Sequence, residues 1–226
     1  MRSPIFPNCV LRLTRLALRP LERPIGELLW WVVTRHWHHQ EFDGFCLVDW
    51  VSDPKTREHW DLFFSKTTQA LQLVFSSDPK RLARMRRDMP RVVLVSGGGN
   101  LYTHGWRACE LDVSQLPEAT PLSLSVTLVH EATHARLCKA GITYWSEDRQ
   151  RVEAACLGSE AAYARRLPDS AELRELLKWR QESLRKQWWT DYHLLKRKLG
   201  RAQADRLPRW ARRFIMAVYA AGRGTR

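Results

Sequence analysis

Acidic residues and cysteines are scarce in this chain, and long apolar runs are missing. The 226 residues hold 24 Asp and Glu against 37 Lys and Arg, a formal net charge of +13. The five cysteines are an odd number without a Cys-x-x-Cys pair, which argues against a disulfide scaffold and favours reduced thiols. The apolar stretch 28–33 is far shorter than the roughly 20 residues that span a bilayer.

The N-terminal region does not have the pattern of a secretory signal. Arg12, Arg15 and Arg19 interrupt each apolar run. Together with the cysteine usage, this predicts a cytoplasmic protein. The excess of basic residues favours acidic partners, such as nucleic acid or an anionic membrane surface, although a charge excess is also common in proteins that bind neither.

The chain reads as one α+β domain with a segment on either side. We predict an N-terminal arm over residues 1–42, a core over 43–168, and a basic, tryptophan-rich helical extension over 169–226. Period-2 patterns, prolines and glycines within the core mark its expected elements. These are a strand at 45–51, a helix through 59–75 opened by Asp53-Pro54, a basic helix after Asp78-Pro79, a strand at 91–95, one or two strands within 101–116, and helices at 121–140 and 146–167.

The sequence "HEATH" carries the most specific chemical signal. His130 and His134 are four residues apart, so a helix places both imidazoles on one face. Two such histidines can bind one zinc ion at ~2.0–2.1 Å. Glu131 is turned by about 100° from His130 and can take a proton from a zinc-bound water. The alternative is a surface helix with incidental histidines, but apolar neighbours such as Leu128 and Val129 argue against it.

A hydrolytic zinc site needs a third protein ligand and an open fourth position. Glu153, which lies 19 residues after His134 among small residues, is the ligand that we predict. Glu160, two helical turns further on, is the second choice. An ion pair with Arg149 is the alternative role for Glu153. We expect one zinc ion per chain.

These residues resemble the gluzincin zinc metallopeptidases, in which the two histidines of His-Glu-x-x-His and a downstream glutamate hold the metal. The resemblance covers residues 43–167 and is closest to the compact single-domain members. It implies a zincin-like fold, with a small sheet over a backing helix and the motif helix, and peptide or protein substrates at an edge strand. Thermolysin-like members have an aspartate four residues after the ligand glutamate. Leu157 stands there, so the residue that orients a histidine must come from elsewhere.

Several weaker signals remain open. Tyr144 is the first candidate to stabilise the oxyanion, and Tyr163 and His104 are the others. "RHWHH" at 35–39 reads as an aromatic surface rather than a metal site, and "SGGGN" at 96–100 as a strand turn. The main prediction is a zinc metallopeptidase. The alternatives are a zinc hydrolase with another substrate, or a non-catalytic basic module that binds nucleic acid or a membrane.

Overall fold

The structure is a computed structural model that describes residues 34–51, 59–97, 99–142, 149–168 and 170–184, together with 24, 27, 30 and 31. Its strands are β1 (His38–Phe42), β2 (Phe45–Asp49), β3 (Arg91–Val95), β4 (Leu101–Thr103) and β5 (Ala108–Asp112). Its helices are α2 (Trp60–Ser77), α3 (Pro79–Asp88), the 3-10 helix η1 (Val113–Gln115), α4 (Pro121–Lys139), α5 (Arg149–Ala164) and α6 (Ala171–Leu184). The predicted α+β class is confirmed. Most of the predicted arm over 1–42, the Asp53-Pro54 start and most of the basic extension lie outside the described residues.

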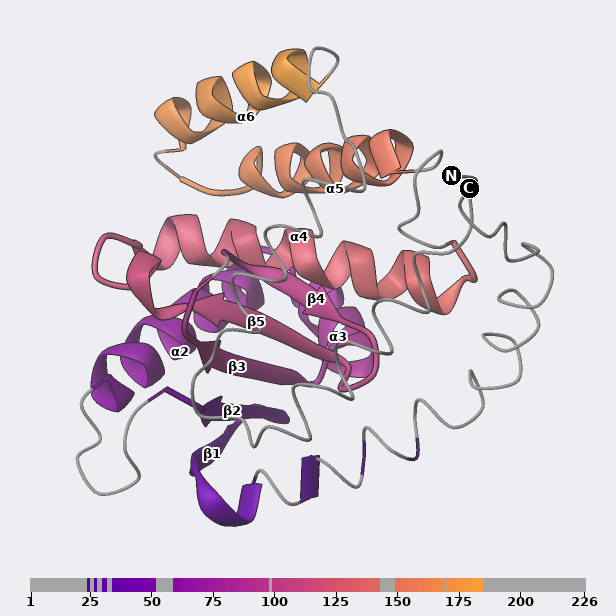
Figure 1. The fold of residues 1–226 in the computed structure, drawn as a ribbon. Coiled ribbons are helices and arrows are strands. Elements are labelled where there is room, and N and C mark those ends of the chain that lie inside the picture. Colours follow the sequence, from indigo (N-terminus) through magenta and orange to yellow (C-terminus); the bar gives the residue numbers. More distant parts are fainter. Residues whose placement is uncertain are drawn as a thin grey trace, which may run out of the picture.

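The five strands form one mixed sheet in the order β1-β2-β3-β5-β4 (Figure 1). The central strands β2, β3 and β5 run parallel, whereas β1 and β4 are antiparallel to their neighbours. β4 and β5 are consecutive strands joined by a tight turn, and Arg107 in that turn has a left-handed φ of 51°. This hairpin makes β4 an edge strand of the sheet.

Alternation along the central strands produces two apolar layers. In β3, Val92 and Leu94 face the main core, and Val93 faces the opposite side. The main core packs the sheet against α2, α3 and α4. The opposite face carries a smaller cluster in which Trp50 and Trp106 have ring centroids 4.7 Å apart. Both faces are therefore apolar, as the nearly continuous hydrophobic run of β3 predicts.

Capping residues fix where two predicted helices begin. The Asp78 carboxylate accepts a hydrogen bond from the Arg81 backbone N–H at 3.0 Å, directly before Pro79. At the start of α4, Thr120 and Ser123 form a capping box. Gly141 follows α4 with a φ of 81°, which agrees with the predicted helix end. The motif helix therefore begins and ends where the sequence predicts.

Three helices lie in successive layers beyond the sheet. Figure 1 shows α4 on the sheet, α5 above α4, and α6 outermost. The contacts agree, since α4 packs against α5 and α5 against α6. α4 is therefore covered on both sides, by the sheet and by α5. This position explains why His130 and Glu131 are only 7% and 6% exposed, although they are polar.

Candidate metal centre

Three polar side chains from α4 and α5 converge between the two helices. The Nε2 atoms of His130 and His134 lie 3.0 Å apart. The Glu153 carboxylate has one oxygen 3.4 Å from Nε2 of His130 and the other 3.5 Å from Nε2 of His134. Ligands at ~2.0–2.1 Å in a tetrahedron around zinc are about 3.3–3.4 Å from one another. The mutual spacing of these three side chains is therefore close to that of ligands around one metal ion.

Cys156 is a further donor that sequence reasoning missed. Its sulfur and one ring nitrogen each of His130 and His134 all lie within 4.8 Å of one another, a group that could hold a metal ion. Cys156 follows Glu153 by three residues on α5 and is fully buried. Burial raises the pKa of the Cys156 thiol, and the negative charge of Glu153 adds to this effect. The signal in the sequence was the i, i+3 spacing from Glu153, which places both side chains on one face.

Glu160 contacts His130 through the opposite ring nitrogen. Its carboxylate forms a short hydrogen bond with Nδ1 of His130. Glu160 therefore lies on the other side of the imidazole ring from the point where the two Nε2 atoms meet. Glu160 is 1% exposed, and its other oxygen accepts a hydrogen bond from Nη1 of Arg180 at 2.9 Å. A carboxylate at the second ring nitrogen of a histidine ligand fixes the ring and its tautomer. Glu160 therefore occupies the position from which a carboxylate would orient His130, and Leu157 has no polar group for this purpose.

Buried carboxylates dominate the electrostatics of this region. Burial opposes a charge on His130, but hydrogen bonds with Glu153 and Glu160 outweigh it and raise the pKa of His130 to about 10. Burial alone would raise the pKa of Glu153. Its hydrogen bonds with His130 and His134 outweigh burial and lower this pKa. A buried set of imidazoles and carboxylates is suited to bind a cation.

Glu131 lies beside this set, next to the edge strand. Burial raises the pKa of Glu131, while the positive charges of His130 and His134 act against this shift. The Tyr102 backbone N–H donates a hydrogen bond to its carboxylate. Tyr102 belongs to β4, so the motif glutamate lies between the two histidines and the edge of the sheet. A carboxyl group whose pKa is raised is a stronger base than an ordinary carboxylate and can also return the proton that it accepts.

The structure describes two of the three candidates for stabilising the oxyanion. Tyr144 lies outside the described residues. Tyr163 is fully buried, and its hydroxyl accepts a hydrogen bond from Ser77 at 3.5 Å. His104 contacts Cys138. Among the described residues, the three histidines of "RHWHH" are not part of a metal-binding group.

The glycine turn after β3 is built around Asp112. The backbone N–H groups of Gly97 and Gly99 donate to its carboxylate at 3.3 and 2.7 Å. Both glycines have a left-handed φ, 78° and 76°. These hydrogen bonds lower the pKa of Asp112 in spite of its partial burial. The predicted strand turn is therefore confirmed.

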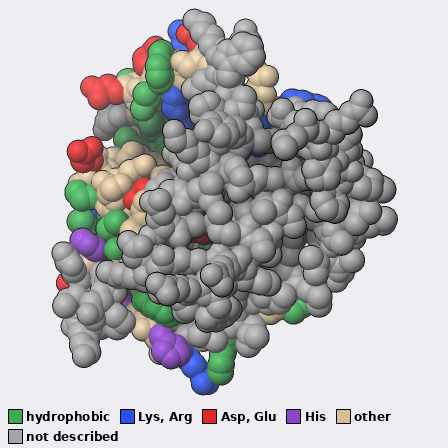
Figure 2. Space-filling model, viewed as in Figure 1, with side chains coloured by type: hydrophobic (Ala, Val, Ile, Leu, Met, Phe, Trp, Pro, Cys, Tyr) green, Lys and Arg blue, Asp and Glu red, His purple; other side chains and the backbone are tan. Residues whose placement is uncertain are grey.

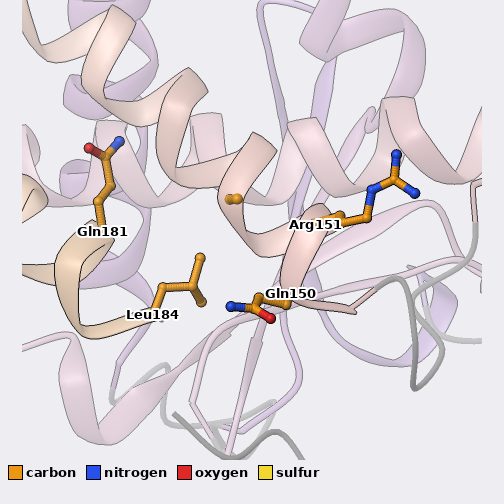
Figure 3. A pocket seen from close by; sticks show the side chains of 5 residues that line it. Gln150, Arg151, Gln181 and Leu184 are labelled. Atoms are coloured by element: carbon orange, nitrogen blue, oxygen red, sulfur yellow. The ribbon is translucent and has the colours of Figure 1, made fainter. Parts of the chain in front are cut away.

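A separate cavity of about 410 Å³ opens between α5 and α6 (Figure 3). Gln150, Arg151 and Ala154 from α5 line it, with Gln181 and Leu184 from α6. None of these residues belongs to the converging set of His130, His134 and Glu153.

The surface, the helices and the comparisons add three findings. In Figure 2 the visible Lys and Arg side chains of the described residues are scattered rather than gathered in one patch. Within the part of the chain that the structure describes, no helix is both long and apolar enough to cross a membrane. A comparison of the chain with models of protein families, with curated proteins and with solved structures gave no match.

Proposed function

We propose that this chain is a zinc-dependent hydrolase of peptide bonds, with His130, His134 and Glu153 as the metal ligands. The observation that carries the proposal is the convergence of the two Nε2 atoms and the Glu153 carboxylate at 3.0, 3.4 and 3.5 Å. Three ligands leave the fourth position of a tetrahedron open, as hydrolysis requires. The residues also belong to the motif that resembles the gluzincins.

The arrangement assigns a role to each residue of the site. When bound, zinc supplies Lewis acidity, which polarises a carbonyl group and acidifies water. Glu131 accepts a proton from the attacking water and then donates it to the leaving amine. Glu160 holds the imidazole of His130 in the tautomer whose Nε2 faces the metal. Arg180 in turn holds Glu160.

The edge strand supports a peptide as the substrate. Tyr102 of β4 donates its backbone N–H to Glu131, which brings this strand next to the base. β4 is paired with β5 on one side and stands at the edge of the described sheet. An extended peptide can bind such an edge through main-chain hydrogen bonds. In the zincin-like arrangement that we infer, the scissile bond then lies beside Glu131.

Cys156 favours a second candidate function. If its thiolate joins His130, His134 and Glu153, four protein ligands close the site, and zinc then has a structural role. The thiol of Cys156 must lose its proton before it can bind a metal. Burial disfavours this loss, because it raises the pKa of Cys156 in the metal-free protein. We therefore prefer the open site.

Metal analysis and a protease assay test the proposal together. We expect the purified full-length chain to contain about one zinc per chain by elemental analysis. It should also cleave an unfolded protein such as casein, lose this activity with a chelator, and regain it when zinc is restored. A chain that binds no zinc after reconstitution would contradict the metal site. A stoichiometric zinc protein that cleaves no peptide in a diverse library would favour the structural role.

The buried Glu160 gives a graded test of the metal centre. We expect Glu160→Gln to weaken zinc binding by about 10–100-fold, because His130 loses the charge that orients its ring. Competition with a chromophoric chelator measures this affinity. Glu175→Gln, an exposed change on α6, is the matched control and should leave the affinity unchanged. Equal affinities for wild type and Glu160→Gln would refute the orienting role.

A further inference from the structure

A thiol and an imidazole meet outside the candidate metal centre. The sulfur of Cys138 and Nδ1 of His104 lie 3.1 Å apart, within hydrogen-bond distance. Cys138 is in the last turn of α4, and His104 begins the turn between β4 and β5. The Arg107 backbone N–H closes this turn by donating to the carbonyl oxygen of His104 at 3.1 Å. Two ordered elements therefore hold the pair together.

Exposure distinguishes Cys138 from the other described cysteines. Cys109 and Cys156 are buried, whereas Cys138 is half-buried and His104 is exposed. Cys46 is also half-buried, but burial raises the pKa of its thiol to about 11. A thiol reacts through its thiolate and needs access for the reagent. Of these four cysteines, Cys138 combines access with an adjacent base.

A thiolate at Cys138 needs a partner such as His104, because the electrostatic field of α4 disfavours negative charge at this position. The C-terminal end of α4 carries the negative end of the helix dipole, which disfavours negative charge on Cys138. A neutral imidazole at 3.1 Å can accept the thiol proton, and the resulting imidazolium then stabilises the thiolate. The reactivity of Cys138 therefore depends on His104.

We propose that Cys138 and His104 form a nucleophilic thiol site that reacts with soft electrophiles, such as a carbon or sulfur centre that carries a leaving group. In the reaction with an alkyl halide, Nδ1 of His104 accepts the thiol proton and the sulfur forms a bond to carbon. The carbon–halogen bond breaks, and halide leaves with the electron pair. The overall step exchanges a sulfur–hydrogen bond for a sulfur–carbon bond without oxidation.

Competitive alkylation of the folded, full-length chain tests this site. The protein is treated with limiting iodoacetamide, and mass spectrometry of the peptides follows each cysteine with time. We expect Cys138 to react at least about tenfold faster than Cys46. His104→Gln should slow Cys138 by about tenfold or more, because the general base is lost. His39→Gln, at another exposed histidine, is the control and should leave the rate unchanged.

Two results would overturn the proposal: a Cys138 rate no higher than that of Cys46, or an unchanged rate in folded His104→Gln protein. Circular dichroism establishes the folding of the variant. The measurement needs neither bound metal nor peptide hydrolysis, so its failure is distinct from a failure of the proposed zinc site.

Discussion

Replacing Glu131 with glutamine is expected to lower peptide hydrolysis by at least about 10²–10⁴-fold while zinc binding and folding are retained. Glutamine has nearly the same shape but cannot accept a proton from water. Its neutral amide also removes the burial penalty that raises the pKa of Glu131, so the fold should tolerate it. The loss should therefore appear in kcat rather than in the bound zinc.

The measurement compares kcat and KM of zinc-loaded proteins on one peptide selected from a library. Glu118→Gln is the matched control, because Glu118 is exposed and precedes α4 rather than lying on its buried face, and it should keep full activity. Full activity in zinc-loaded Glu131→Gln protein would show that another group acts as the base. Loss of zinc from this variant would instead make Glu131 a ligand.

Glu153→Ala is expected to reduce the zinc content from about one per chain to nearly none after dialysis, whereas Cys156→Ala should retain zinc. The reason is geometric. The Glu153 oxygens already lie at 3.4 and 3.5 Å from the two Nε2 atoms, near the tetrahedral spacing, whereas the Cys156 group spans distances of up to 4.8 Å. The Glu153 carboxylate therefore already has the spacing that a tetrahedral site requires.

Elemental analysis and a cobalt-substituted protein distinguish the two ligand sets. A sulfur ligand adds a thiolate-to-cobalt charge-transfer band in the near ultraviolet, and an oxygen ligand does not. We expect this band to be absent from the wild type. A strong band in the wild type that disappears in Cys156→Ala would show a sulfur ligand. If Glu153→Ala also retained zinc, the ligands would be His130, His134 and Cys156 instead of the set that we propose. Circular dichroism of the metal-free variants controls for unfolding.

Local sequence signals predicted those features that depend on neighbouring residues. Asp78 before Pro79 and Thr120 before Pro121 marked helix starts because capping is a contact over about three residues. The i, i+4 spacing placed His130 and His134 on one face for the same reason. The α+β class followed from alternating patterns within single elements. Each of these inferences needs only the geometry of one helix or strand.

Features that depend on how helices rotate against one another could not be predicted. Glu153, Cys156 and Glu160 lie on one face of α5, and the sequence does not show which of them faces Nε2 and which faces Nδ1 of His130. That choice is set by the packing of α5 on α4. Arg180 contributes from a third helix. The contact between His104 and Cys138 joins residues 34 apart, which no local pattern reveals.

The layered order of α4, α5 and α6 has a consequence for partial unfolding. α5 packs on the sheet-bound α4, and α6 packs on α5, so we expect α5 and α6 to open together if this part of the chain unfolds before the sheet. Such an opening would part Glu153 on α5 from the two histidines on α4. A metal ion that requires both helices binds only the closed form and therefore stabilises it by mass action. Hydrogen exchange in α5 and α6 would then depend on the concentration of free metal, while exchange in the central strands would follow global unfolding.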